Sequence, residues 1–191
     1  MIKKSERVLT DRDLWLMIAQ SSVGDTYRPL NLRGANLTGA DLSGADLSGA
    51  NFAGANLTSV NLSGANLAGA FFANATLLDA DLSHANLTGA MMQHTQMQNS
   101  KLEMADFTEA NLTEANLSGA SMIDSDFTRA DLSLSIIISG TFKRANLFKA
   151  NMSGADLSGS DFNDANLART YMNDANMNNV VNIERAVGYK G

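Results

Sequence analysis

The sequence predicts an all-β fold, a square parallel β-helix whose coils are each twenty residues long. Two observations predict it. From Leu30 to Val180, the five-residue pattern Ala-(Asn/Asp)-Leu-(Ser/Thr)-Gly recurs thirty times without an inserted or deleted residue. Six phenylalanines of this pattern form three pairs spaced twenty residues apart, Phe52/Phe72, Phe107/Phe127 and Phe142/Phe162. Four pentapeptides joined by bends of about 90° would close one such coil and stack these rings inside it.

Each pentapeptide has a large apolar residue at its centre, and the thirty centres run from Leu32 to Met177 in steps of five. A small residue, Ala in twenty-one cases, lies two positions before the centre. Apolar residues at spacings of two and three would be spread around the whole surface of a helix, and a five-residue step breaks the alternation of a strand. The pattern therefore predicts short extended pieces separated by bends. Gly, Asn or Asp two positions after the centre favours the positive φ that such bends require.

The repeat divides the chain into three predicted parts. Residues 1–29 lack the repeat and are expected to form an N-terminal helical cap, in which Thr10 N-caps a helix and the apolar segment 14–18 covers the end of the solenoid. Residues 30–180 would form about 7.5 coils, a rod roughly 36 Å long at a coil spacing of ~4.8 Å. Residues 181–191 are expected to form a shorter C-terminal cap, with Val181, Ile183 and Val187 out of register.

Composition narrows the class of protein. The chain has no cysteine, which excludes disulfides, thiolate metal sites and thiol nucleophiles. Charged residues 11–13 interrupt the apolar run that a signal peptide needs, and no apolar run approaches the ~20 residues of a membrane span. The net charge is −6, and residues 31–180 carry fifteen acids against seven bases. We therefore expect a soluble cytoplasmic protein that binds neither nucleic acid directly nor a membrane.

The chain resembles the pentapeptide-repeat protein family. The stretch from Gly34 to Gly49, GANLTGADLSGADLSG, matches the family motif residue for residue, and the repeat covers about four-fifths of the chain. The resemblance implies a right-handed quadrilateral β-helix with the centre and the small residue pointing inward. It also implies one candidate function, because some family members protect bacterial type II topoisomerases from quinolones and a rod with negative faces has been interpreted as a mimic of duplex DNA.

Residues that could carry catalysis or bind a metal have simpler interpretations. His84 and His94 are ten residues apart, which places them on opposite faces of a twenty-residue coil. Eight aspartates precede a centre, on the convex outside of a filled rod where we expect solvated carboxylates: Asp41, Asp46, Asp81, Asp106, Asp126, Asp131, Asp156 and Asp161. The asparagines at the same position are expected to form hydrogen-bonded ladders. We therefore predict no enzyme activity, no metal, no cofactor and no small-molecule substrate.

Charge along the rod bears on the topoisomerase hypothesis. Six of the eight aspartates fall on two adjacent faces, those of Leu42 and Leu47. The Leu47 face also carries a basic column, Arg129, Lys149 and Arg169, spaced twenty residues apart with Lys143 and Arg144 beside it. Positive charge there works against a DNA-like potential.

Bulky apolar residues occupy outward positions where the repeat usually has polar ones. Phe71 and Met91 should touch, Leu134, Ile136 and Ile138 should cluster at a corner, and Leu78 and Tyr171 fall in the same columns. A contiguous exposed apolar patch indicates a partner or self-association; scattered drift in a tolerant repeat is the other interpretation. The sequence thus predicts a noncatalytic solenoid scaffold that binds an unidentified protein or a second copy of itself, with a regulator of DNA gyrase as the alternative.

Overall fold

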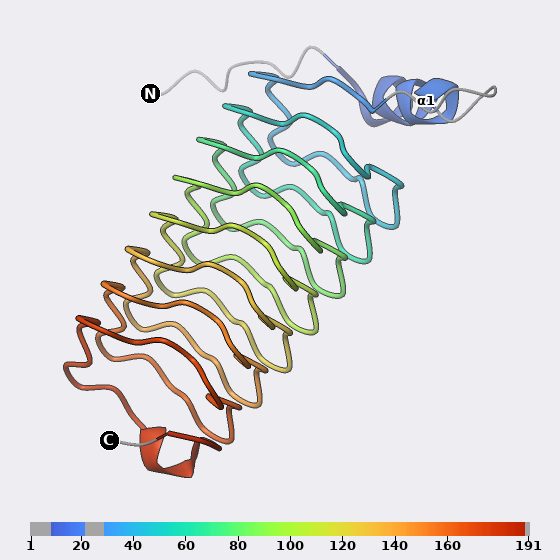
Figure 1. Ribbon diagram of the computed structural model, residues 1–191. Helices are drawn as coiled ribbons and strands as arrows, with labels where there is room; N and C mark the ends of the chain where they lie inside the picture. The colour runs from blue at the N-terminus through green and yellow to red at the C-terminus, as the bar shows by residue number, and fades with distance from the viewer. Residues whose placement is uncertain (1–8, 22–28, 190–191) are drawn as a thin grey trace, which may run out of the picture.

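The computed structural model describes residues 9–21 and 29–189, so residues 1–8, 22–28 and 190–191 of the two predicted caps lie outside it. The described chain forms an α-helix, α1 (Asp11–Ser21), a solenoid of stacked coils, and a short 3-10 helix, η1 (Ile183–Arg185). Figure 1 shows the coils stacked along one axis, with α1 at the N-terminal end and η1 at the other.

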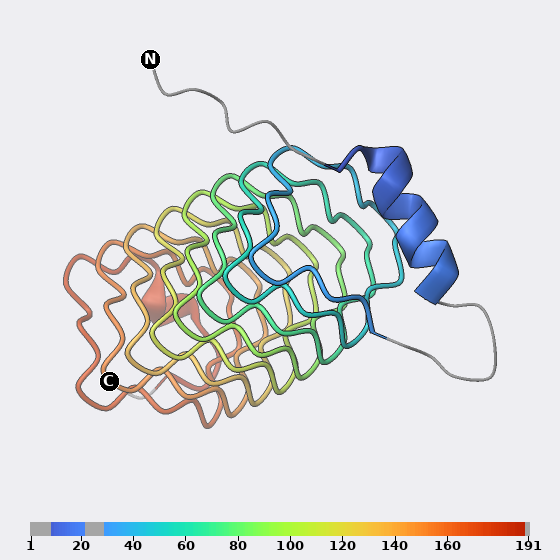
Figure 2. The same ribbon diagram turned by 90° about the horizontal axis from the view of Figure 1, so that it is seen from above.

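The coils are held in register by isolated parallel β-bridges. Within the repeat, bridges join residues twenty positions apart, from Asn31↔Asn51 to Asp161↔Val181. The N–H of Leu112 donates to the carbonyl of Asp131 in the next coil at 2.7 Å, and the N–H of Asp131 donates back to the carbonyl of Ala110 at 2.9 Å. In Figure 2 the coils follow one another around a common interior. The twenty-residue coil predicted from the phenylalanine pairs is confirmed.

A tight turn closes every pentapeptide. In the turn after Leu112, the N–H of Ala115 donates to the carbonyl of Leu112 at 3.0 Å, and Glu114 between them has a φ of 58°. Each of the thirty residues at this turn position has a positive φ, and none of the nineteen that are not Gly is β-branched. The absence of Val, Ile and Thr follows from the steric cost of the left-handed conformation, which is greatest for a branched Cβ.

Substitutions at Met104 test this turn conformation, because its side chain is exposed and its φ is 58°. We expect Met104→Val to lower the free energy of unfolding by about 1–2 kcal/mol, since a branched Cβ strains a left-handed residue. Met104→Gly relieves the strain at the cost of backbone entropy and should stay within about 1 kcal/mol of the parent. Urea unfolding followed by circular dichroism measures both, and equal stability of the two variants would contradict the assignment of strain to the turn.

The interior is filled as predicted by the centres and the small residues that precede them. The three phenylalanine pairs stack face to face, with ring centroids 4.9, 4.7 and 4.9 Å apart. Phe127 also meets Phe142 edge to face across the interior, at 6.0 Å. Where Ser or Thr replaces the small Ala, its hydroxyl bonds a backbone carbonyl, as Ser125 Oγ does to the carbonyl of Met122 at 2.6 Å. The core therefore tolerates these hydroxyls without an unsatisfied buried group.

Helix α1 covers one side of the N-terminal end. Thr10 caps it as predicted: Thr10 Oγ1 accepts from the N–H of Asp13 at 3.2 Å, and Asp13 Oδ2 accepts from the N–H of Thr10 at 2.9 Å. The side chains of Asp11 and Trp15 make hydrogen bonds to the first coil that the backbone of a preceding coil would otherwise make. Asp11 Oδ1 accepts from the N–H of Asp41, and Trp15 Nε1 donates to the carbonyl of Asp41, both at 3.2 Å. These two bonds satisfy backbone groups that the first coil would otherwise leave open.

The apolar segment 14–18 contributes less to the cap than expected. Leu14 and Ile18 are buried in the core cluster and Met17 packs partly against it, whereas Trp15 and Leu16 are exposed. The helical period explains this correction, because residues four apart share a face and the intervening ones point elsewhere. The described residues contain no helix that is both long and apolar enough to cross a membrane.

At the C-terminal end, the predicted break in register comes later than expected. Val181 still pairs with Asp161, twenty residues earlier, so the prediction that it leaves the register is wrong. Val187 pairs with Asn166, and 187 − 166 = 21, so η1 adds one residue to this last turn of the chain. Ile183 is partly buried against the core, whereas Val187 is exposed.

Candidate interaction surfaces

The eight outward aspartates are bound to the backbone of their own turns. In each, Oδ1 accepts the N–H of the residue two positions later at 2.7–3.2 Å; the acceptors are Asp41, Asp46, Asp81, Asp106, Asp126, Asp131, Asp156 and Asp161. Six of them are half-buried, and only Asp41 and Asp46 are exposed. The expectation of solvated carboxylates is corrected, because the short side chain folds back into an Asx turn.

Hydrogen bonds donated to three of the outward carboxylates lower the pKa values of these groups. The hydroxyl and the backbone N–H of Ser158 hold the pKa of Asp156 below its ordinary value, and Ser43 does the same for the pKa of Asp41. At the surface, the guanidinium of Arg144 lowers the pKa of Asp124, to which it donates two bonds at 2.6 and 2.5 Å. Ser43, Ser158 and Arg144 thus stabilise the charged form of the carboxylates that they contact. A general base that works near neutral pH needs a raised carboxyl pKa, which is the opposite shift.

Acid should therefore weaken the fold. A carboxylate with a lowered folded-state pKa stabilises the fold above its unfolded pKa of about 4, and the stabilisation is lost as the pH falls through the folded pKa. We expect the urea midpoint to fall as the pH drops below about 4. Asp156→Asn should reduce this acid dependence with little change at pH 7, because Asn makes the same turn in thirteen pentapeptides. Midpoints at neutral and acidic pH measure it, and an identical acid dependence in parent and variant would contradict the assignment.

Asparagines extend these turns into ladders along the axis. Asn66 Nδ2 donates to Asp46 Oδ1 at 3.0 Å, and Asn86 Nδ2 donates to Asn66 Oδ1 at 3.3 Å. Further rungs join Asn61 to Asp41, Asn151 to Asp131 and Asn176 to Asp156. The predicted asparagine ladders are therefore present, and they use Asn and Asp together.

The two histidines lie at turns of different faces of the solenoid. His84 and His94 both occupy left-handed turn positions, with φ of 60° and 58°. His94 Nδ1 lies 3.3 Å from Glu114 Oε2 in the next coil, at the surface. No group of three or more His, Cys, Asp or Glu side chains suited to a metal gathers in residues 9–21 and 29–189.

We call Leu134, Ile136 and Ile138 the apolar corner. Ile136 and Ile138 flank the buried Ile137 and are 41% and 42% exposed, and Leu134 at the preceding turn is 56% exposed. Leu134 leans along the axis over Gly154, where an added Cβ would lie 2.8 Å from Leu134 Cδ2. The N–H of Ile136 donates to the carbonyl of Ala115 at 2.9 Å and its carbonyl accepts from the N–H of Leu117 at 2.7 Å, both in the preceding coil, and a β-bridge pairs Ile136 with Asp156 in the following coil. The corner thus presents apolar side chains on a backbone with no open edge.

The other predicted apolar residues do not join this corner. Phe71 and Met91 are exposed and pair as adjacent rungs. Polar rungs then follow in their column, which reads Phe71, Met91, Asn111, Asp131, Asn151 and Tyr171. At the neighbouring turn, the His94–Glu114 pair lies before Leu134. Polar rungs therefore divide the predicted strip into a Phe71/Met91 patch, the apolar corner, and Tyr171 at the far end of the column.

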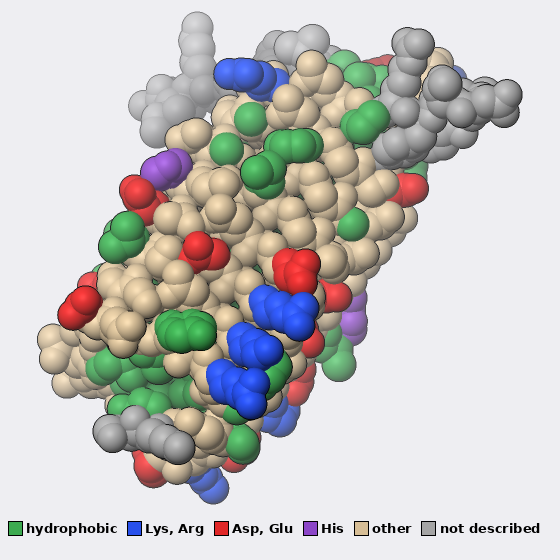
Figure 3. Space-filling view, viewed as in Figure 1, with side chains coloured by type: hydrophobic (Ala, Val, Ile, Leu, Met, Phe, Trp, Pro, Cys, Tyr) green, Lys and Arg blue, Asp and Glu red, His purple; other side chains and the backbone are tan. Residues whose placement is uncertain are grey.

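The basic column is Arg129, Lys149 and Arg169, at successive turns of one face. Figure 3 shows the Lys and Arg side chains in line along the solenoid axis, toward its C-terminal end. Arg129 Nη1 bonds Glu109 Oε1 at 3.0 Å. Lys149 Nζ and Arg169 Cζ lie 5.2 and 5.9 Å from the ring centroid of Phe148, within the range of a cation–π contact. Within the described chain, neither Lys149 nor Arg169 has a carboxylate oxygen within 4.0 Å.

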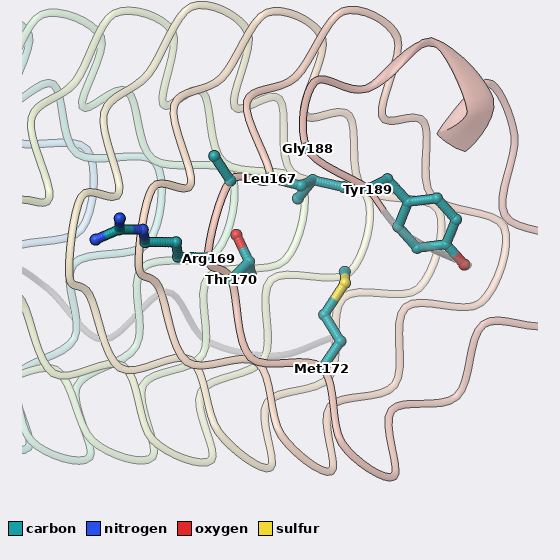
Figure 4. Close-up of a pocket in the computed structure, with 7 residues that line it drawn as sticks. Leu167, Arg169, Thr170, Met172, Gly188 and Tyr189 are labelled. Carbon is teal, nitrogen blue, oxygen red and sulfur yellow. The ribbon is translucent and has the colours of Figure 1, made fainter.

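An open cavity of about 490 Å³ lies at the C-terminal end, beside the basic column. Arg169 of the basic column is one of its lining residues, together with Leu167, Ala168, Thr170, Met172, Gly188 and Tyr189. In Figure 4 the side chain of Arg169 points away from Met172 and Tyr189, back toward the earlier coils. Sequence reasoning missed this cavity; its signal was that Met172, which lines it, has no pentapeptide twenty residues later to stack on it.

Comparisons with known proteins agree with this architecture. The pentapeptide-repeat family model matches residues 31–69, 65–103, 105–136 and 142–180. A trypsin-treated form of QnrB1, a plasmid-mediated fluoroquinolone resistance protein, has a TM-score of 0.50 at 18% identity, over 78% of this chain and 84% of that chain. This likeness shows the fold alone. A comparison with curated proteins finds no match.

Two further solved structures are similar at lower TM-scores. HetL, involved in heterocyst differentiation regulation in the cyanobacterium Nostoc sp. strain PCC 7120, is 24% identical over 90% of this chain and 94% of that chain, with a TM-score of 0.31. A pentapeptide-repeat protein of the Arabidopsis thaliana thylakoid lumen is 39% identical over 53% of this chain and 68% of that chain, with a TM-score of 0.33. No enzymatic family is indicated. This chain is therefore a right-handed β-helix solenoid of the pentapeptide-repeat family, as shown by its own repeats, its coil register and the match of the family model.

Proposed function

We propose that this protein is a noncatalytic scaffold that binds another protein through the apolar corner. The carrying observation is that Leu134, Ile136 and Ile138 are exposed together in a repeat whose other outward positions are mostly polar. Burying a Leu or Ile side chain contributes about 1.5–3 kcal/mol to association, before the costs of binding. The paired backbone beneath them supports this proposal, because a rigid surface loses little conformational entropy when it binds.

The two isoleucines provide a direct test of the proposal. We expect Ile136→Asp combined with Ile138→Asp to abolish association, since two charges would be buried in an apolar contact. Sedimentation velocity measures self-association, and capture of cell proteins on immobilised protein measures a different partner. The matched control is Gln96→Asp with Gln98→Asp, which changes the same two columns two coils earlier. Unchanged self-association and unchanged capture in the isoleucine variant would remove the proposal.

A regulator of DNA gyrase is the second candidate, and its support is the family and the acidic repeat. Two features of the charge distribution count against a mimic of duplex DNA. The outward aspartates are bound into turns and mostly half-buried, and the basic column interrupts one of the two acidic faces. We expect no effect of micromolar protein on gyrase supercoiling, with or without a quinolone. Inhibition, or protection from the drug, would favour this candidate over the scaffold.

A further inference from the structure

The basic column supports an inference that goes beyond the apolar corner and does not depend on it. We propose that Arg129, Lys149 and Arg169, together with Phe148, bind an acidic α-helix of a partner protein that lies along the solenoid axis. The observations that carry this are the unbalanced charge of the column, its spacing, and the apolar surface beside it.

The column stands out because its last two cations, Lys149 and Arg169, follow one another without a carboxylate partner among the described residues. In the neighbouring turn column, Arg144 lies between two acids. The hydrogen bond to Asp124 raises the pKa of Arg144, and the charge of Asp164 raises it further. In the basic column, Glu109 pairs with Arg129, after which Lys149 and Arg169 follow without a carboxylate. Lys149 is therefore placed between two arginines. An anionic partner would relieve this repulsion, and the rest of the described column supplies no acid to do so.

The spacing of the column favours a helix over an extended segment. Coils stack at ~4.8 Å, so the two steps from Arg129 to Arg169 span about 9.6 Å. Carboxylates at positions i, i+3 and i+7 of a helix span about 10.5 Å along its axis. Carboxylates at i, i+2 and i+4 of a strand span about 13 Å, too far for three matched contacts. A helix laid parallel to the solenoid axis can therefore place carboxylates opposite Lys149 and Arg169 and a third beside Arg129, whose guanidinium also bonds Glu109.

The charges around the column favour a protein over a nucleic acid. Asp126 precedes Arg129 in the same pentapeptide, and Asp124 and Asp164 lie at the neighbouring corner. A duplex presents phosphates over a broad surface and would meet these carboxylates as well as the cations. One stripe of carboxylates on a helix meets the cations and avoids the acids. The narrow width of the positive surface thus selects a single line of negative charge.

An apolar contact can accompany the charges. The ring of Phe148 is half-buried and lies beneath Lys149 and Arg169. The open cavity begins at the C-terminal end of the column, where Leu167 and Met172 contribute apolar lining. Arg169 also lines this cavity, and in Figure 4 its side chain points away from Met172 and Tyr189. A helix with apolar residues beside its acidic stripe would cover Phe148 and reach this lining.

The test uses the full-length protein and two synthetic peptides of equal composition. One peptide carries Glu at i, i+3, i+7 and i+10 of a helix with Leu beside this stripe, and the other carries the same residues at alternating positions. Fluorescence anisotropy should show binding of the helical peptide, weakened by added salt and by at least about 10-fold in Lys149→Glu. Lys101→Glu, the same charge change on another face, should bind as the parent does. Far-UV circular dichroism checks that both variants fold.

Three results would overturn the proposal. The first is no binding of the helical peptide to the parent at about 100 µM. The second is equal binding of the two peptides, or equal weakening by Lys149→Glu and Lys101→Glu, because either would mean general charge attraction. The third is tighter binding of a DNA duplex than of the helical peptide, with the DNA lost in Lys149→Glu, which would assign the column to a nucleic acid.

Discussion

Leu112→Asp is expected to unfold the middle of the solenoid and to lower the free energy of unfolding by at least about 4–5 kcal/mol. Leu112 is fully buried, in a column of centres that continues with Met92 in the coil before and Leu132 in the coil after. A carboxylate there loses its hydration and finds no cation in an interior of apolar side chains. Because each coil contacts only its neighbours, the two halves should then unfold as separate units.

Chemical unfolding followed by circular dichroism, together with hydrogen exchange, measures this effect. We expect one transition for the parent, and for Leu112→Asp either two transitions or loss of protection centred on residues 92–132. Gln93→Asp is the matched control, since it adds a charge at an outward position of the same face in the coil before. A single transition with the parent's midpoint in Leu112→Asp would contradict the filled interior.

Phe127→Ala is expected to have the second-largest effect, a loss of about 3–5 kcal/mol. Phe127 stacks on Phe107 at 4.7 Å and meets Phe142 edge to face at 6.0 Å, so its removal leaves a cavity and breaks two ring contacts. The coils above and below limit how far the interior can collapse around the cavity.

Two variants separate packing from mere loss of an aromatic ring. Phe127→Leu should cost less than Phe127→Ala, because Leu87 and Leu147 are centres of the same face. Phe148→Ala removes a half-buried ring from the outside and should cost less again. Urea midpoints rank the three, and a loss in Phe148→Ala as large as that in Phe127→Ala would contradict the assignment of inward and outward positions.

The sequence predicted the interior well because the repeat specifies it directly. Each centre recurs every five residues, so its inward direction and the position of its turn follow from the count alone. The twenty-residue coil followed from Phe52 and Phe72 and their counterparts, which report which pentapeptides are stacked. The cap of α1 was predicted from Thr10 by local chemistry.

The surface was predicted less well because it depends on what neighbouring coils place between two residues. Phe71, Met91 and Leu134 share one face, yet Asn111 and Glu114 separate them into different patches. The role of the aspartates depended on a side-chain rotamer that the repeat pattern does not reveal. The cavity beside Tyr189 depended on where the last coil ends, and the bonds from Asp11 and Trp15 to Asp41 depended on how α1 docks. These features belong to tertiary contacts and chain ends, where no periodicity operates.

The central claim is that the repeat is scaffold and that binding resides in outward residues that depart from it. Quantitative comparison of the proteins captured from native cell extract by three immobilised forms tests this most directly: the parent, Ile136→Asp with Ile138→Asp, and Gln96→Asp with Gln98→Asp. At least one protein should be recovered equally by the parent and the glutamine variant and be lost from the isoleucine variant. Recovery of the same proteins in the same amounts by all three forms would contradict it.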